Sequence, residues 1–115
     1  MFNFQNLDVY KKSRLFHLAC KTILKEHKAE KYVIDQMGRA SFSIVLNIAE
    51  GLAKTSNADR RNYFTVARGS VFECVAVLDL LNDEHRLSDE QYQTNLGLAD
   101  EISRMLYIMI QNLSK

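Results

Sequence analysis

The sequence predicts an all-α protein that folds as an antiparallel four-helix bundle with up-down-up-down topology, and two observations favour this fold class. The chain contains no proline and only four glycines, whereas a β-rich fold needs frequent turn residues. Hydrophobic residues also recur every three or four positions over four long segments, which is the spacing of one helix face. The length of 115 residues suits one domain, residues 1–115, that needs no metal or disulfide for stability.

The first two helices are expected over residues 7–27 and 30–53, with Asn6 as the N-cap of the first. The expected core face of the first helix comprises Val9, Phe16, Ala19, Cys20 and Ile23. That of the second comprises Ile34, Met37, Ser41, Ile44, Ile48 and Leu52. Glycines inside the helices indicate a close approach between helices or, alternatively, a backbone site for a ligand.

The third helix is expected over residues 58–83, capped by Ser56 or Asn57, and the fourth begins at Ser88, which forms a capping box with Gln91. Heptad spacing in the third helix predicts left-handed packing of nearly parallel axes. Its core positions are Phe64, Ala67, Val71, Cys74, Leu78 and Leu81. Those of the fourth are Tyr92, Ala99, Ile102, Leu106, Met109 and Leu113. Short loops cannot cross helices of roughly 30–40 Å, so consecutive helices must be antiparallel.

The last two helices carry more hydrophobic residues than one core face requires. Beyond the core positions lie Val66, Phe72, Val75, Val77, Leu80, Leu98, Met105, Tyr107 and Ile108. A surface helix of a monomer usually has a polar face, and extended apolar surface indicates a protein interface. The sequence therefore predicts a homo-oligomer, the alternative being a thick core with some exposed apolar residues.

Charge is distributed unevenly along the chain, although the net charge is only +1. Residues 1–71 hold 12 Lys and Arg against 6 Asp and Glu, whereas residues 72–115 hold 3 against 8. Basic residues fall within one arc of the first helix, and others gather at one end of the bundle, which predicts either a solvated face or a surface that contacts phosphates. The candidate nucleic-acid-binding residues are Lys11, Arg14, Lys21, Lys25, Lys28, Lys54, Arg60 and Arg61.

A second set of polar residues recurs at helical spacing near the interface of the second and third helices. Buried polar groups are costly unless they are paired, so we expect a hydrogen-bonded network that fixes the helix register. A ligand or catalytic site is the alternative. The members of this candidate network are Arg39, Ser43, Asn47, Glu50, Arg68, Ser70 and Glu73.

No pattern in the chain predicts catalysis. The histidines His17, His27 and His85 lack the spacing of metal ligands, and the sequence contains no Glu-x-x-His, Cys-x-x-Cys or Gly-x-Ser-x-Gly motif. We therefore expect no enzyme activity, no catalytic or metal-binding residue, no cofactor and no small-molecule substrate. Cys20 and Cys74 lie in apolar stretches and are predicted to be buried thiols rather than a disulfide or a reactive pair.

The start of the chain lacks a basic segment followed by a long apolar run, and no apolar run approaches the roughly 20 residues that span a bilayer. We therefore expect a cytoplasmic protein that does not interact with membranes.

A set of short segments distributed over nearly the whole chain forms a specific signature, which begins with segment 7–10, Leu-Asp-Val-Tyr. It continues with Gln36, Arg39 and Ala40, then with segment 43–51, Ser-Ile-Val-Leu-Asn-Ile-Ala-Glu-Gly. The third helix contributes Tyr63, Phe64, segment 67–70, Ala-Arg-Gly-Ser, and Glu73. By this signature the sequence resembles the 23S rRNA intervening-sequence protein family, also called the four-helix-bundle protein family.

The resemblance implies a four-helix bundle that assembles into a ring-like homopentamer. Family members are encoded within intervening sequences of bacterial rRNA genes and elsewhere in genomes. The chain is also similar to the accessory variability determinant of diversity-generating retroelements, a basic pentamer that binds nucleic acid and a reverse transcriptase. The family implies no catalytic residue for any position of this sequence.

Two functions stay open at this point. The first is a non-catalytic homo-oligomer, pentameric by resemblance, that binds RNA, DNA or a nucleoprotein partner through its basic surface. The second is a protein-interaction scaffold that does not bind nucleic acid and whose basic residues pair with acidic groups of neighbouring copies.

Overall fold

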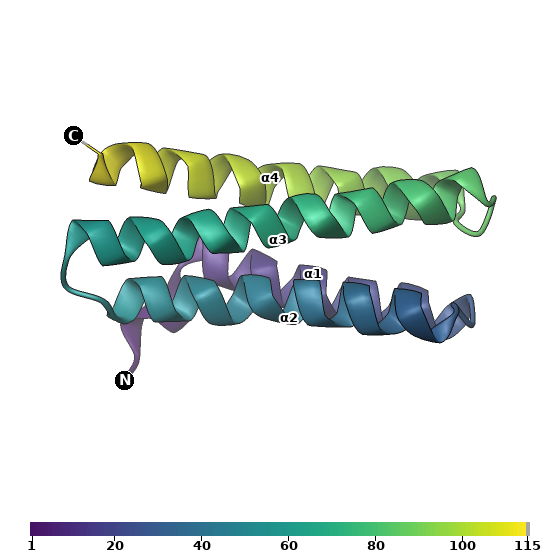
Figure 1. The fold of residues 1–115 in the computed structure, drawn as a ribbon, viewed down its shortest axis with the longest axis horizontal. Coiled ribbons are helices and arrows are strands. Elements are labelled where there is room, and N and C mark those ends of the chain that lie inside the picture. The colour runs from purple at the N-terminus through teal and green to yellow at the C-terminus, as the bar shows by residue number, and fades with distance from the viewer. Residues whose placement is uncertain (115) are drawn as a thin grey trace.

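The computed structural model describes residues 1–114, which contain four α-helices after a short 3-10 turn, η1, at Asn3–Asn6. The helices are α1 (Asp8–Glu26), α2 (Lys31–Ala53), α3 (Asn57–Asp83) and α4 (Asp89–Leu113). They run up, down, up and down, so that the α1–α2 and α3–α4 loops share one end of the bundle (Figure 1). The all-α four-helix fold is confirmed, while the handedness of its packing stays a prediction.

The helices begin where short polar side chains can cap them. The Ser56 hydroxyl accepts a hydrogen bond from the Asp59 backbone N–H, and Ser88 forms the expected capping box with Gln91. The prediction that Asn6 caps the first helix was wrong, because η1 includes Asn6 and the N-cap position belongs to Leu7. Leu7 offers no side-chain cap, and Asp8 in the first turn interacts favourably with the helix dipole instead.

Two helices end without the glycine that usually allows a left-handed turn. Lys28 follows α1 with φ 46°, and His85 follows α3 with φ 58°. The next backbone N–H groups, those of Ala29 and Arg86, donate back to the carbonyls of Leu24 and Leu81. This pattern is the Schellman motif, and it turns the chain sharply toward the next helix.

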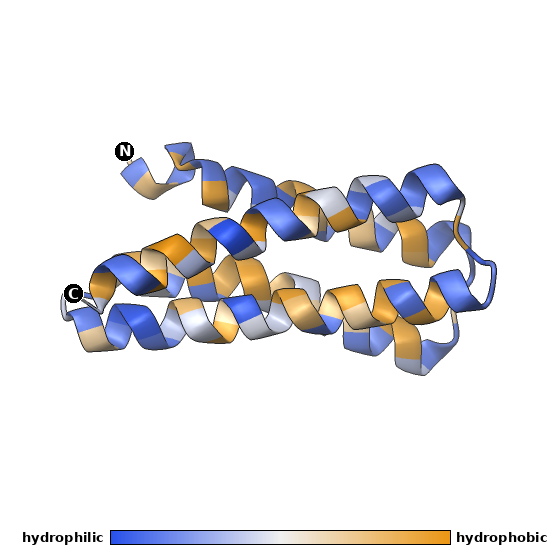
Figure 2. Cartoon of the chain, turned by 90° about the horizontal axis from the view of Figure 1, so that it is seen from above, coloured by the Kyte–Doolittle hydropathy of each residue, from blue (hydrophilic) through white to orange (hydrophobic). Residues whose placement is uncertain are grey.

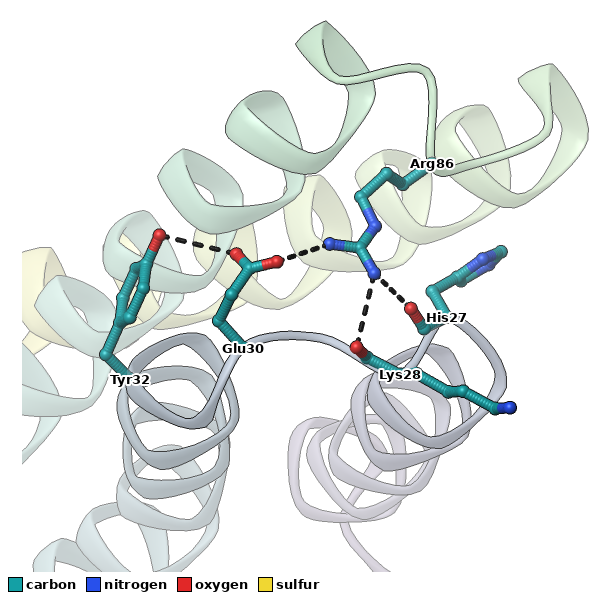
Figure 3. Close-up of polar contacts among 5 residues, drawn as sticks. All are labelled: His27, Lys28, Glu30, Tyr32 and Arg86. Carbon is teal, nitrogen blue, oxygen red and sulfur yellow. Dashed lines mark hydrogen bonds and ion pairs between the residues drawn. The ribbon is translucent and has the colours of Figure 1, made fainter.

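Arg86 fastens the α1–α2 loop to the α3–α4 loop (Figure 3). Its guanidinium forms an ion pair with Glu30 at 2.7 Å and donates to the backbone carbonyls of His27 and Lys28. The carboxylate of Glu30 also accepts a hydrogen bond from the Tyr32 hydroxyl at 3.3 Å. Because one side chain bonds two loops that are far apart in sequence, it fixes where α1 and α3 end relative to each other.

We predict that Arg86→Met lowers the free energy of unfolding by roughly 1–3 kcal/mol, because the substitution removes the bonds to two backbone carbonyls and one carboxylate. Urea denaturation measures the change. Arg104→Met is the matched control, because Arg104 forms only an exposed ion pair with Asp100 and should alter stability by about 0.5 kcal/mol or less. Equal effects of the two substitutions would contradict the role given to Arg86.

The core lies along the inner faces of the helices, and hydrophobic residues, orange in Figure 2, recur along every helix. All six core positions expected in α3 are buried. In α2 the prediction for Ile34 was wrong, because its side chain is 42% exposed near the start of the helix, where α2 borders a groove. Within residues 1–114, no helix combines the length and the apolar character needed to cross a membrane.

Cys20 of α1 and Cys74 of α3 meet in the core, and both side chains are fully buried and free. The interaction with the Cys74 thiol, followed by burial, raises the pKa of Cys20 well above its usual range. The thiolate is the reactive form of cysteine, so the folded protein keeps this side chain in its unreactive state.

The most extensive helix contact joins α2 to α3, and at Gly51 the absence of a side chain lets the Phe64 ring pack against the backbone of α2. A Cβ added to Gly51 would lie 2.5 Å from Cε1 and 2.8 Å from Cδ1 of the Phe64 ring. The expectation that helical glycines mark close approaches therefore fits Gly51. It does not fit Gly38, Gly69 or Gly97, because a Cβ at each of these would meet nothing within 4 Å.

We predict that Gly51→Ala lowers the free energy of unfolding by about 1–3 kcal/mol, because the added methyl group overpacks the contact with Phe64. Gly97→Ala should instead raise it by up to about 1 kcal/mol, since alanine favours the helix and its methyl group enters open space. Urea denaturation of both variants provides the test. A Gly51→Ala variant as stable as Gly97→Ala would refute the steric explanation.

Candidate nucleic-acid interface

Four cations lie along the outer side of α1, and a fifth follows in the loop directly after it; together they form what we call the α1 stripe: Lys11, Arg14, Lys21, Lys25 and Lys28. All five residues are exposed. The part of the stripe on α1 is about 21 Å long, because 14 residues separate Lys11 from Lys25 at about 1.5 Å each. It is therefore longer than one phosphate group and runs along about half of the bundle, whose long axis is 43 Å.

The cations of the α1 stripe have no carboxylate partner among residues 1–114. The Arg14 guanidinium stacks over the Tyr10 ring at 5.7 Å. By contrast, Lys12 on the side of α1 facing α4 forms an ion pair with Glu101 at 2.8 Å, and this hydrogen bond raises the pKa of Lys12. One side of α1 is thus neutralised within the chain, while the stripe keeps its full positive charge.

A groove of about 560 Å³ opens between α1 and α2 beside the middle of the stripe. Its lining combines Lys21, Lys25 and Arg39 with apolar side chains and His17. Nδ1 of His17 is hydrogen-bonded to the buried hydroxyl of Ser41 at 2.8 Å. Burial, and then the charge of Lys21, lowers the pKa of His17, so the imidazole is neutral at pH 7 and the lysines and arginine supply the charge.

The three remaining candidate cations lie at the opposite end of the bundle from the loops that Arg86 joins, and two of them already have contacts within the chain. Lys54 lies 3.8 Å from Glu50 and over the Tyr63 ring. Arg61 donates to the backbone carbonyl of Leu113 at 3.4 Å. Arg60 is only partly exposed, and its buried Nε has no hydrogen-bond partner among the described residues. This end of the bundle therefore presents fewer fully exposed, unpaired cations than the α1 stripe.

The structure brings three members of the candidate polar network together between α2 and α3. Nδ2 of Asn47 donates to both the carbonyl and the hydroxyl oxygen of Ser43, each at 2.9 Å, and the Ser70 hydroxyl donates to that of Ser43 at 3.1 Å. Glu73 is linked separately, since it accepts a 2.5 Å hydrogen bond from Gln36. The Ser43–Ser70 and Gln36–Glu73 bonds therefore join α2 to α3 at two positions along the helix axes.

The other members lie apart from this cluster. Glu50 pairs with Lys54, and Arg39 borders the α1–α2 groove. Arg68 donates to the carbonyl of Ser103 at 3.3 Å. None of the ion pairs described within residues 1–114 joins Arg39 or Arg68 to Glu50 or Glu73.

Arg68 also organises an aromatic surface between α3 and α4. Its guanidinium lies 4.9 Å from the Phe72 ring centre and 5.3 Å from that of Tyr107. Phe72 remains 56% exposed, and neighbouring Ile108 remains 59% exposed. We call Arg68, Phe72, Tyr107 and Ile108 the α3–α4 patch. Arginine and aromatic residues of this kind are enriched at the energetic centres of protein interfaces.

Sequence reasoning missed two features of these surfaces. Periodicity predicted that Ile34 is in the core, whereas its side chain lines the α1–α2 groove. No motif predicted that Phe42 lines the same groove. Phe42 lies between Ser41 and Ser43 on α2. The only hint of the groove in the sequence was this aromatic residue outside the predicted core face. The link between Arg86 and the α1–α2 loop spans more than 50 residues and had no local signal.

These observations define a four-helix bundle with an unpaired basic face and uncovered apolar surface. No group of three potential metal ligands occurs within the described part of the chain. The chain belongs to the 23S rRNA-intervening sequence protein family, which matches residues 5–108. The family resemblance of the sequence is thereby confirmed.

Known proteins of two kinds are similar to the chain. One is a crystal structure from Bacteroides thetaiotaomicron, described as a protein of unknown function from the S23 ribosomal protein family. It has a TM-score of 0.82 and 28% identity, covering 89% of this chain and 97% of that one. The other is reticulocyte-binding protein 2 of Plasmodium vivax (strain Belem), 31% identical over 93 residues, or 79% of this chain. The chain spans only 3% of that protein's length.

Proposed function

We propose that the protein is a non-catalytic homo-oligomer that binds nucleic acid, or a nucleoprotein partner, through the α1 stripe. The observation that supports this most is the run of five exposed cations with no carboxylate partner among residues 1–114. A row of free cations attracts phosphates because binding releases the counterions condensed on a nucleic acid. The family's link to intervening sequences of rRNA is consistent with RNA as the ligand.

We predict that the protein binds RNA with an affinity that falls steeply as salt rises. The double variant Lys21→Gln with Lys25→Gln should bind more weakly and reduce the slope of log K against log salt by about 1.4 for single-stranded RNA. Fluorescence anisotropy over a salt series measures both quantities.

The matched control is Lys12→Gln with Arg104→Gln, which removes the same charge from cations that are already paired with Glu101 and Asp100. This control should keep the slope of the unmodified protein. Absence of binding at low salt, or equal losses in both double variants, would count against the α1 stripe as the nucleic-acid surface.

Self-association rests on a separate observation, the exposed α3–α4 patch. Its apolar side chains remain uncovered in one copy, and burying them against another copy would remove apolar surface from water. The basic first half and acidic second half of the chain favour contacts between unlike faces of neighbouring copies. Such head-to-tail contacts form a closed ring when the rotation between copies closes on itself, and the family resemblance favours a ring of five copies.

We predict that Phe72→Glu with Ile108→Glu yields a smaller assembly than the unmodified protein, because two carboxylates cannot be buried in an apolar interface without partners. Sedimentation equilibrium measures the mass. Gln93→Glu with Thr94→Glu adds the same charge to exposed polar positions of α4 and should leave the mass unchanged. A monomeric unmodified protein at micromolar concentration would contradict self-association.

A protein-interaction scaffold that does not bind nucleic acid is the second candidate function. The charge difference between the two halves of the chain favours it, because the α1 stripe could pair with acidic groups of a neighbouring copy. In that case rising salt would dissociate the assembly, and the Lys21→Gln with Lys25→Gln variant would lose mass in sedimentation without any nucleic acid present.

A further inference from the structure

The groove between α1 and α2 carries more cations than the other grooves described between the helices. Lys21, Lys25 and Arg39 supply three positive charges, and no carboxylate lines it. Leu24, Ile34 and Phe42 supply an apolar surface between them. Two grooves contain a carboxylate, that of Asp100 or of Asp8. The two grooves that Arg68 lines lack a carboxylate but hold at most two cations, and one of these, Arg104, is paired with Asp100. The α1–α2 groove therefore selects an anion with an apolar body.

The floor of this groove suits a flat ring. Phe42 is 53% exposed, and its ring lies 5.9 Å from that of His17 at a tilt of 59°. Beside it, Gly38 has no side chain, and a Cβ at this position would enter open space. A ring stacked on Phe42 can thus approach the backbone of α2 closely, while Nδ1 of His17 stays bound to Ser41.

The groove also lies within the α1 stripe rather than apart from it. Lys21 and Lys25 belong to both, with Lys11 and Arg14 on one side along α1 and Lys28 on the other. A ligand whose charge lies only in the groove would leave the outer cations unused. A single strand has phosphates on both sides of every base and can engage the whole row.

We propose that the α1–α2 groove holds an unstacked base of a single-stranded nucleic acid, with the base on Phe42 and the adjoining phosphates on Lys21, Lys25 and Arg39. This inference rests on the proposed nucleic-acid function and adds that single strands are the preferred form. A base within a duplex is already stacked and cannot enter the groove, whereas base stacking on an aromatic side chain strengthens single-strand binding with little regard to sequence.

The test uses the full chain with labelled oligouridylate, a labelled RNA duplex and uridine monophosphate as probes. Gly38→Leu fills the groove without a clash at Cβ and without changing any charge. It should weaken oligouridylate binding about tenfold, the factor expected for the loss of one stacked base, and leave duplex binding unchanged. Gly97→Leu makes the same substitution on α4, where a Cβ also enters open space, and should bind both probes like the unmodified protein.

The outcomes separate this inference from the function on which it rests. If the unmodified protein binds both probes and Gly38→Leu weakens neither, or weakens both equally, the groove proposal is overturned and the α1 stripe stands. If uridine monophosphate binds as tightly as oligouridylate, the ligand is a free nucleotide and the strand proposal is overturned. If no probe binds the unmodified protein at low salt, the proposed function fails as well. Phe42→Leu keeps the groove apolar but removes the ring, and should reproduce the selective loss for oligouridylate.

Discussion

The contact between α2 and α3 is the constraint on which the rest of the structure depends. It is the most extensive helix contact, and three interactions along its length set one register: Gln36 with Glu73, Ser43 with Ser70, and Gly51 with Phe64. These residues are also among those by which the sequence resembles its family. Six residues of the shared signature are therefore explained by how two helices pack.

With α2 and α3 fixed, the other two helices are placed by their loops. The left-handed residues Lys28 and His85 turn the chain at one end of the bundle, and Arg86 binds the two turns to each other. As a result, α1 lies against α2 and α4, and the cations of the α1 stripe are exposed. The core is narrow, since helices of this kind bury only one stripe each, and the side chains beyond that stripe remain available for other molecules.

Most of the fold follows from local sequence, because helical spacing and caps act over a few residues. The ends of α2 to α4 lie within one residue of their expected positions wherever an end was predicted, and every core position of α3 is buried. The N-cap role predicted for Asn6 was wrong because Asn6 belongs to a 3-10 turn. The core position predicted for Ile34 was wrong because periodicity does not show where the neighbouring helix no longer covers that face of α2. The α1 stripe was visible as a charge pattern. The groove beside it was not, since Gly38, His17 and Phe42 come together only when α1 packs on α2.

The two buried thiols in the core allow the opening of the helix bundle to be measured by chemical modification. Cys20 and Cys74 are sealed from solvent in the native state, so a thiol reagent can reach them only when the helices separate. With reagent in excess, the speed of modification reports how often α1 and α3 part, whether by local opening or by complete unfolding. Any ligand or neighbouring copy that holds the helices together would slow the modification of the thiols. Binding could therefore be detected on the unmodified sequence, with no substitution.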